Sequence, residues 1–274
     1  MDNQTILGKL DPEVLDRMAT RRDALRGAGS LGLGLALASV PLGLAALAKS
    51  AFAQGIPAAV VSVLNFALVL EELEAEFYVR GVAAAGLIPA TDRTIFTTIR
   101  DHEVAHVQFL RDALGGQAVA KPTFDFTAGG AFSPFTDYAQ FRALAQAFED
   151  TGVRAYKGQA PDLLVAPAIL RAALTIHSVE ARHASEVRRL NGNFQSMEPQ
   201  QGWITLNDRG VVPAAAQAVY DGEENVTQAG INVATLPGAA GTLSAEAASE
   251  AFDEPLTRAQ VLAIVDPFVV EPLS

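Results

Sequence analysis

The chain has 274 residues, half of them apolar, which is enough material for one sizeable hydrophobic core. It contains no cysteine, which excludes disulfides, zinc–thiolate sites, iron–sulfur clusters, a cysteine nucleophile and a lipoprotein-type lipid anchor. The formal net charge of −11 disfavours a nucleic-acid partner, because an acidic surface repels the phosphate backbone.

The sequence of residues 1–53 is typical of an export signal, so we do not expect this segment to form part of the fold. Arg21-Arg22 precedes an apolar stretch over residues 27–48, and residues 51–53 supply a small-x-small cleavage site. The arginine pair resembles a twin-arginine signal, which implies a periplasmic or otherwise exported protein. The alternative is an uncleaved N-terminal membrane anchor, since the stretch is long enough to span a bilayer. In either case the chain contacts the membrane only through this segment.

Four amphipathic helical patterns follow, and we expect helices over residues 58–85, 92–114, 134–158 and 167–190. Thr91 or Asp92 can cap the second helix, and Ser133 can cap the third, with Pro134 as its first residue. Short loops join the helices within each pair, whereas residues 117–132 form a long connection between the pairs. The pattern predicts an all-α fold, a four-helix bundle over residues 54–192 with a long crossover between helices two and three.

The sequence pattern of residues 193–274 predicts a loop-rich C-terminal extension. Glycine and proline recur through residues 193–245 with little hydrophobic periodicity, so we expect this part to lie over the bundle in extended form. One short helix is expected at residues 258–265, where Thr257 can cap its start and Pro267 can stop it.

The histidines lie only on the second and fourth predicted helices, and each of these helices contains a Glu-x-x-His motif. Glu103 and His106 form one motif, and Glu180 and His183 form the other. Residues three apart share a helix face, so one carboxylate and one imidazole can approach the same ion. The two motifs predict paired metal-ligating positions.

The first and third predicted helices carry a second matched pattern. Glu71 is followed seven residues later by Tyr78, and Glu149 by Tyr156, which places each pair on one helix face. The Glu-x-x-His motifs begin 32 residues after Glu71 and 31 residues after Glu149. The sequence therefore indicates two copies of one helical hairpin. Glu71 also falls within an apolar stripe, where a charge needs a partner or a metal ion.

These residues resemble the ferritin-like di-iron carboxylate superfamily, and in particular the broad bacterial ferritin-like domain family. The resembling segments are residues 70–78, 102–106 and 179–183, and the resemblance covers about residues 58–192. It implies a ferritin-like bundle around two metal ions. The expected ligands are Glu71, Glu103, His106, Glu149, Glu180 and His183, with Glu74 as an extra candidate.

Other acidic residues near these positions are weaker candidates for metal ligands than the six residues named above. Glu74 shares the face of Glu71, but Gly152 stands at the matching position of the third helix, so Glu74 has no counterpart. Glu72 and Glu76 are expected on a solvated face. Asp150 is a weaker candidate than its neighbour Glu149, because consecutive side chains differ by about 100° around a helix.

Tyr78 and Tyr156 are candidates for catalysis close to the metals, although hydrogen bonding across the bundle is the simpler role for a buried tyrosine. His102 precedes Glu103 and is expected to point elsewhere. His177 lies one turn before Glu180 and is either a residue that supports the site or a hydrogen-bonded core histidine.

Four carboxylates and two imidazoles suit two iron ions, with manganese as the alternative, and lack the thiolates of structural zinc. We therefore expect oxidoreductase-type chemistry: ferrous iron oxidation with oxygen or peroxide, serving iron handling or oxidative-stress protection. The alternative is a non-catalytic bundle in the cell envelope that metal ions hold together and whose extension binds a partner or a second copy as a homo-oligomer. Mineral storage in a hollow shell is disfavoured, because the signal and the extension differ from shell-forming ferritins.

Overall fold

The computed structural model describes residues 56–192, 201–239 and 241–271. The predicted export signal at residues 1–53 lies outside the described residues. Within them, no helix combines the length and the apolar composition needed to cross a membrane.

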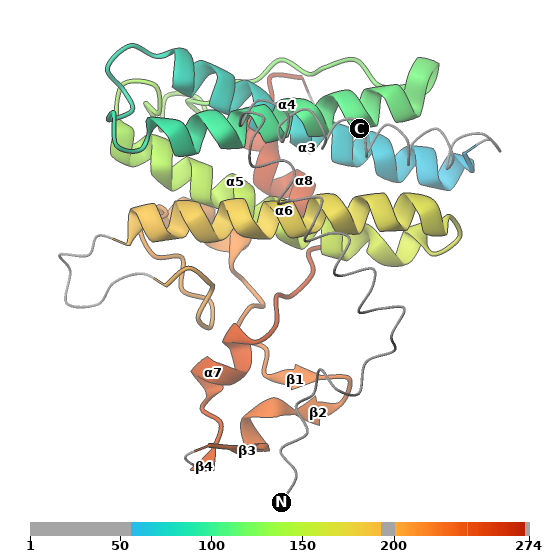
Figure 1. The fold of residues 1–274 in the computed structure, drawn as a ribbon, viewed down its shortest axis with the longest axis vertical. Helices are drawn as coiled ribbons and strands as arrows, with labels where there is room; N and C mark the ends of the chain where they lie inside the picture. The colour runs from blue at the N-terminus through green and yellow to red at the C-terminus, as the bar shows by residue number, and fades with distance from the viewer. Residues whose placement is uncertain (1–55, 193–200, 240, 272–274) are drawn as a thin grey trace, which may run out of the picture. The chain divides into compact units, whose positions relative to one another are not determined.

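Four long helices form the body of the fold (Figure 1): α3 (Ala58–Ala83), α4 (Arg93–Leu114), α5 (Tyr138–Gln159) and α6 (Pro167–Asn191). Helix α3 packs chiefly against α4, and α5 packs chiefly against α6, so the two predicted hairpins are present. A short 3-10 helix, η4 (Ala160–Leu163), joins α5 to α6. The mostly helical architecture confirms the predicted fold class.

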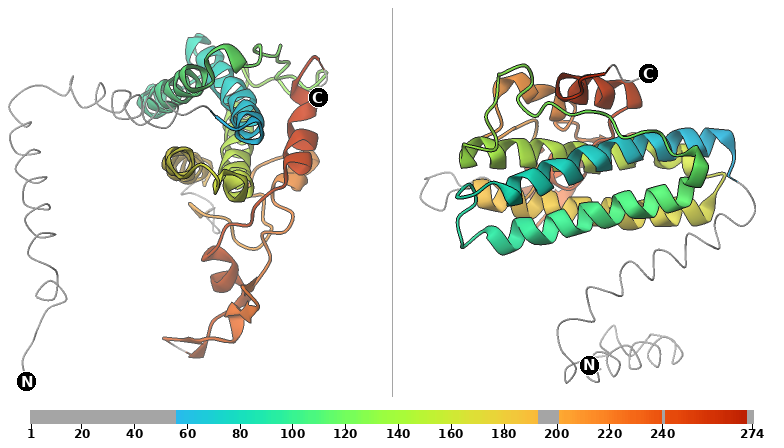
Figure 2. Two further views of the ribbon diagram at one scale, coloured as in Figure 1. Left: turned by 90° about the vertical axis from the view of Figure 1, so that its right-hand side faces the viewer. Right: turned by 90° about the horizontal axis from the view of Figure 1, so that it is seen from above.

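The connection between the hairpins begins with the 3-10 helix η3 (Gly115–Gln117) and continues along α3 (Figure 2). Asn65 of α3 holds it there: its amide donates to the carbonyl of Gln117 at 2.9 Å and accepts from the backbone of Val119 at 2.9 Å. Further along, Phe124 and Phe126 are buried in the main core. The long crossover is therefore a packed part of the fold.

The predicted start of the third helix at Ser133-Pro134 is wrong. Helix α5 begins at Tyr138, and Asp137 is its N-cap, because the Asp137 carboxylate accepts hydrogen bonds from the backbone amides of Ala139 and Gln140. Aspartate is among the strongest N-cap residues. The carbonyl of Ser133 instead accepts from the amides of Thr136 and Asp137, which closes a turn before the helix.

Asp92 precedes α4 but its side chain makes no capping hydrogen bond, contrary to prediction. The Asp92 carboxylate accepts instead from the hydroxyl of Tyr138 at 2.5 Å. This contact joins the start of α4 to the start of α5, so a residue expected to act locally connects the two hairpins.

The C-terminal extension contains more regular structure than its sequence indicates. It comprises η5 (Ala214–Val219), the antiparallel pair β1 (Thr227–Gln228) and β2 (Ile231–Asn232), η6 (Val233–Thr235), the antiparallel pair β3 (Pro237–Gly238) and β4 (Gly241–Thr242), α7 (Ala245–Glu250), α8 (Arg258–Val265) and η7 (Asp266–Phe268). Helix α8 has the predicted bounds, and Thr257 and Gln260 form a capping box at its start.

The main core joins the bundle helices to the crossover and to α8, and it is rich in aromatic rings. Phe77 of α3 stacks on Phe141 of α5 with ring centroids 4.8 Å apart. Gly81, one turn after Phe77, makes room for this pair, because a Cβ at Gly81 would lie 2.2 Å from the Phe141 ring. Helix α8 adds Val261 and Val265 to the same core, so the extension contributes to its packing.

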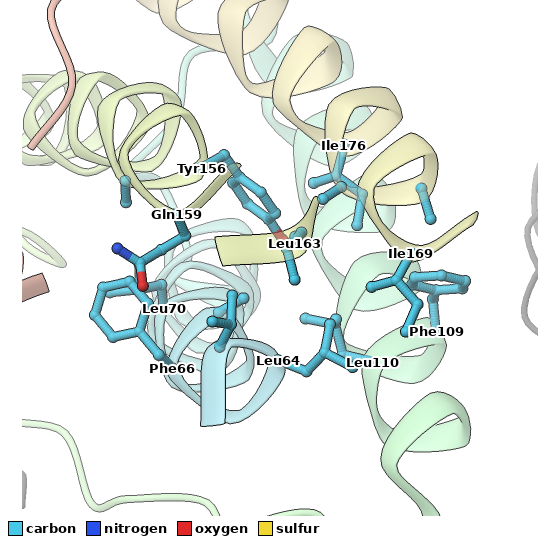
Figure 3. Close-up of a pocket in the computed structure, with 15 residues that line it drawn as sticks. Leu64, Phe66, Leu70, Phe109, Leu110, Tyr156, Gln159, Leu163, Ile169 and Ile176 are labelled. Carbon is cyan, nitrogen blue, oxygen red and sulfur yellow. The ribbon is translucent and has the colours of Figure 1, made fainter. Parts of the chain in front are cut away.

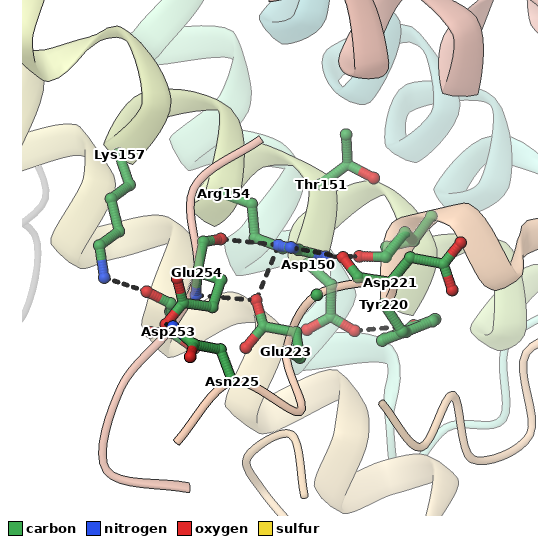
Figure 4. Close-up of polar contacts among 12 residues, drawn as sticks. Asp150, Thr151, Arg154, Lys157, Tyr220, Asp221, Glu223, Asn225, Asp253 and Glu254 are labelled. Atoms are coloured by element: carbon green, nitrogen blue, oxygen red, sulfur yellow. Dashed lines mark hydrogen bonds and ion pairs between the residues drawn. The ribbon is translucent and has the colours of Figure 1, made fainter. Parts of the chain in front are cut away.

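A buried arginine on α5 fastens the extension to the bundle (Figure 4). Arg154 is 1% exposed, and its Nε lies 2.7 Å from Oε1 of Glu223. The guanidinium also donates to the carbonyls of Glu254 at 2.8 Å and Asp221 at 2.9 Å, and to the carbonyl of Val219. Two segments of the extension, residues 219–223 and the segment around Glu254, thus meet on one side chain.

A second buried ion pair lies next to this anchor. Arg188 of α6 makes two hydrogen bonds to the carboxylate of Asp150 on α5, at 3.0 and 2.8 Å. Tyr220 of the extension donates its hydroxyl to the same carboxylate at 2.8 Å. Asp150 therefore points away from Glu149, as expected. The guanidinium of Arg188 compensates its negative charge, and Tyr220 adds a hydrogen bond from the extension.

Candidate metal centre

The six predicted ligands converge inside the bundle as two overlapping clusters. In each cluster, one donor atom from every residue lies within 4.8 Å of the others. The first cluster contains Glu71, Glu103, His106 and Glu180, and the second contains Glu103, Glu149, Glu180 and His183. Because Glu103 and Glu180 belong to both, the two clusters form one continuous site.

In the first cluster, His106 of α4 turns its Nδ1 toward three carboxylates. The nearest oxygens belong to Glu71 at 3.2 Å, Glu103 at 3.2 Å and Glu180 at 3.1 Å. These residues come from three helices, α3, α4 and α6. The helical period places Glu103 and His106 on one face of α4, and the bundle supplies the other two carboxylates.

The second cluster repeats this arrangement on the other hairpin. His183 of α6 turns its Nδ1 toward Glu103 at 2.8 Å, Glu149 at 3.3 Å and Glu180 at 3.8 Å. The residues of the second cluster come from α4, α6 and α5, and α5 carries Glu149. The internal repeat seen in the sequence therefore becomes an approximate twofold arrangement in space.

All six side chains are buried, with exposures of 5% or less. Burial raises the pKa of Glu149 to about 8, and the charges of Glu103 and Glu180 act in the same direction against that of His183. The pKa of Glu103 is instead lowered: burial would raise it, but His106 and His183 outweigh burial. A cluster of this many buried carboxylates is stable in a protein interior only when protons or cations are bound to it.

Five donor atoms in the clusters have no hydrogen-bond partner among the described residues. They are Oε1 of Glu103, Oε2 of Glu149, both carboxylate oxygens of Glu180, and Nδ1 of His183. Buried polar atoms are normally hydrogen-bonded, so each orphan needs an explanation. These atoms belong to residues whose donor atoms lie within 4.8 Å of one another inside the clusters, and a cation bound among them would satisfy them together.

The two tyrosines hold the terminal carboxylates in a crossed pattern. Tyr78 of α3 donates its hydroxyl to Oε1 of Glu149 on α5 at 2.6 Å. Tyr156 of α5 donates its hydroxyl to Oε1 of Glu71 on α3. Burial, followed by the neighbouring carboxylates, raises the pKa of both tyrosines, so both hydroxyls stay protonated and donate.

Glu74 faces the site without joining either cluster. It is 3% exposed, and burial followed by the charges of Glu180 and Glu149 raises its pKa. Gly152 of α5 makes room for it, because a Cβ at Gly152 would lie 3.2 Å from Oε1 of Glu74. The missing counterpart at residue 152 therefore has a steric reason: Glu74 lies close to the space that a side chain at this position would occupy.

The structure overturns two expectations about neighbouring residues. His102 was expected to point elsewhere, but its Nδ1 lies 2.9 Å from Nε2 of His183. The overlooked signal is that His102 lies one turn before His106 and so shares its side of α4. Glu72 was expected on a solvated face but is 5% exposed, and Nε of Arg111 donates to it at 2.6 Å.

The other secondary candidates lie outside both clusters. Glu76 is half-buried and pairs with Lys121 at 2.8 Å. His177 has a buried Nδ1 with no hydrogen-bond partner among the described residues, which contradicts the expectation of a satisfied core histidine.

An apolar cavity of about 20 Å³ lies at the end of the bundle next to the site (Figure 3). Leu64, Phe109, Leu163 and Ile176 are among its lining residues, and Tyr156 forms part of its wall. A cavity of this kind, with almost no polar partners, does not hold water well. Because Tyr156 also donates to Glu71, the cavity adjoins the first cluster through one side chain.

In a comparison with known families, the ferritin-like domain family matches residues 59–193. Neither the curated proteins nor the solved structures include a match to the chain. The matched range contains all four bundle helices and both clusters.

Proposed function

Through residues 59–193 the chain belongs to the ferritin-like family, and from this premise we propose that it binds two iron ions and oxidises ferrous iron with oxygen or peroxide. The observation that carries the proposal is the pair of clusters that share Glu103 and Glu180. We further propose that the reaction serves iron handling or protection against oxidative stress.

The residues present fit two divalent ions. Glu71 and His106 would hold one ion, Glu149 and His183 the other, and the two shared glutamates would lie between them. Four carboxylates carry a charge of −4, which two divalent cations neutralise. Oxygen and imidazole donors without thiolates favour iron or manganese. When bound, the pair of iron ions supplies the electrons that reduce oxygen or peroxide.

The protein contributes orientation and exclusion of water. Tyr78 and Tyr156 hold the carboxylates of Glu149 and Glu71 and keep each from rotating away. The buried setting limits solvent, and the apolar wall beside Tyr156 admits small apolar molecules such as dioxygen more readily than water.

Anaerobic reconstitution of the full chain with ferrous iron tests this proposal. We expect two iron ions per chain by elemental analysis, and oxygen consumption with ferric absorbance when oxygen is admitted. The variant Glu180→Gln, which alters a shared position, should reduce the iron content, whereas Glu186→Gln, at a partly exposed position of α6 outside both clusters, should not. Iron-loaded wild-type protein that consumes neither oxygen nor peroxide would contradict the proposed reaction.

The second candidate function is structural: the metal ions hold the bundle together and the protein is not an oxidase. The observation in its favour is that the ligands come from all four helices, so bound ions cross-link both hairpins. Metal-dependent thermal stability without oxygen consumption would support this function over the first.

We also propose that the protein acts after export, on the basis of Arg21-Arg22 and the cleavage site at residues 51–53. Expression of the full chain in a bacterium with a twin-arginine system, followed by N-terminal sequencing of the periplasmic protein, tests this. A mature N-terminus at Gln54 is expected, and the double variant Arg21→Lys, Arg22→Lys should remain in the cytoplasm. Retention of residues 1–53 on membrane-bound protein would indicate an anchor instead.

A further inference from the structure

We infer that His102 is a positioning residue for His183 and that it makes the two halves of the centre inequivalent. This inference rests on the proposed metal binding. His102 Nδ1 lies 2.9 Å from His183 Nε2, and the planes of the two rings differ by only 14°, with centroids 5.2 Å apart. The contact joins α4 to α6, 81 positions apart in the sequence.

The proton in this contact can be assigned from the geometry. His183 turns Nδ1 toward the carboxylates of Glu103 and Glu149, and Nε2 toward His102. An imidazole nitrogen that binds a metal ion has no proton, so neutral His183 carries its proton on Nε2. His183 Nε2 therefore donates, His102 Nδ1 accepts, and the proton of His102 is on its own Nε2.

This arrangement fixes the tautomer and the ring orientation of His183. A histidine ligand depends on a hydrogen-bond acceptor at its other nitrogen for both properties, and loss of that acceptor typically lowers metal affinity about 10- to 100-fold. Most such acceptors are carboxylates or backbone carbonyls. Here the acceptor is a second imidazole, which adds no negative charge to a site that already holds four carboxylates.

Among the residues that the structure describes, His106 has no corresponding support. In the internal repeat, the residue before Glu103 is His102, whereas the residue before Glu180 is Val179, whose side chain cannot accept a hydrogen bond. The polar contacts of His106 with the described residues, two hydrogen bonds and one close approach to Glu180, all involve Nδ1. The second cluster is therefore the one whose imidazole is held in place before a metal ion binds.

Metal titrations of three full-length variants test the inference. His102→Leu removes the acceptor, His102→Asn keeps an acceptor oxygen close to the position of Nδ1, and His177→Leu is a matched control on α6 that lies outside both clusters. Cobalt(II) is the probe, with stoichiometry and affinity from calorimetry and site geometry from its visible spectrum. Thermal unfolding of each metal-free variant verifies that it is folded.

We expect wild type to bind two cobalt ions. His102→Leu should weaken one of them about 10- to 100-fold and leave the other within about twofold, in line with the loss of a supporting hydrogen bond. His102→Asn should recover most of the lost affinity, and His177→Leu should match wild type. Unchanged binding by His102→Leu would overturn the inference. Equal losses in His102→Leu and His102→Asn would also overturn it, because ring volume rather than the acceptor would then matter.

A second measurement separates this inference from the proposed function. In metal-free protein with ¹⁵N-labelled histidine, NMR should show a protonated Nε2 on His183 and a coupling across the hydrogen bond to Nδ1 of His102. If wild type binds no cobalt, the proposed metal centre fails, while this spectrum still shows whether His102 orients His183. An unprotonated His183 Nε2 would overturn the inference whatever the metal content.

Discussion

The hydroxyl of Tyr78 donates a 2.6 Å hydrogen bond to Glu149, so a side chain of α3 holds a carboxylate of α5. Tyr156 returns the contact from α5 to Glu71 on α3. Helices α3 and α5 therefore fix each other's glutamates, although each glutamate has a tyrosine two turns away on its own helix. This crossed pairing makes the position of either carboxylate depend on both hairpins.

Tyr78→Phe should destabilise the metal-free protein, because it leaves a buried carboxylate oxygen of Glu149 without its donor. A loss of about 1–3 kcal/mol in the free energy of unfolding is expected, measured by denaturant titration. Affinity for one metal ion should also fall. Tyr138→Phe is the control, since its hydroxyl bonds Asp92 away from the centre. It should lower stability without changing metal binding, and equal metal affinities in wild type and Tyr78→Phe would contradict the assigned role.

Gly152→Ala should reveal the steric role of this glycine. In a helix interior, alanine is favoured over glycine by about 1 kcal/mol. At residue 152 the added methyl group would lie 3.2 Å from Glu74, so we expect much of that gain to be lost. In a Glu74→Ala background the full gain should return. Denaturant unfolding of the four proteins forms a double-mutant cycle, and a coupling energy near zero would show that Glu74 does not need the space.

The metal-free protein should lose stability as the pH rises from about 5 to 8. Glu149 has an ordinary pKa of 4.5 and a pKa of about 8 in the fold, so the folded state holds a proton that the unfolded state releases. The pKa of His106 and that of His183 are also raised: burial opposes protonation, but the carboxylates outweigh it. Their contribution is complete below pH 6.5 and is lost as the pH rises through the raised pKa. The lowered pKa of Glu103 acts in the opposite sense, but its contribution is already complete above pH 4.5.

Thermal unfolding with a chelator present, repeated across this pH range, measures the effect. Saturating ferrous iron under anaerobic conditions should raise the melting temperature most at the high end, since metal ions displace these protons. Glu149→Gln should flatten the metal-free pH profile. Metal-free stability that rises from pH 5 to 8 would contradict the protonation pattern.

Arg154→Met should weaken the attachment of the C-terminal extension. The change leaves the carboxylate of Glu223 buried without its partner, and breaking a buried ion pair from one side costs about 3–5 kcal/mol. Limited proteolysis should then cleave within residues 219–254 before it cleaves the bundle. Arg189→Met is the control, because Arg189 and Glu186 form a partly exposed pair worth about 0–1 kcal/mol. Equal protease resistance in the two variants would contradict the role of Arg154.

Sequence reasoning predicted the helices and the meeting of the six side chains because both follow from short-range geometry. Three- and seven-residue spacings set which side chains share a helix face, and the near-equal separations of the two motifs indicate one repeated hairpin. The cap at Thr257 is likewise local and was predicted correctly, whereas its reciprocal contact with Gln260 was not predicted. The start of α5 was misplaced because Ser133-Pro134 and Asp137 are both plausible caps, and tertiary packing decides between them.

The features that were missed depend on partners far along the chain. Glu72 is buried because Arg111 covers it from α4, and His102 reaches His183 across the bundle. The strands β1 to β4 are two residues long, too short to show an alternating pattern. Arg154 looked like an ordinary helical arginine, because nothing nearby in the sequence shows that Glu223 will cover it.

The burial of Arg154 also bears on how the chain matures during synthesis. Its partners Val219, Asp221 and Glu254 follow it by 65, 67 and 100 positions, so all four long helices leave the ribosome while this guanidinium is still uncovered. Helix α5, which carries Glu149, therefore reaches its final surroundings only after residue 254 has been synthesised. A prematurely terminated product would display an uncovered cationic surface there, by which quality-control proteases could tell it from a finished molecule.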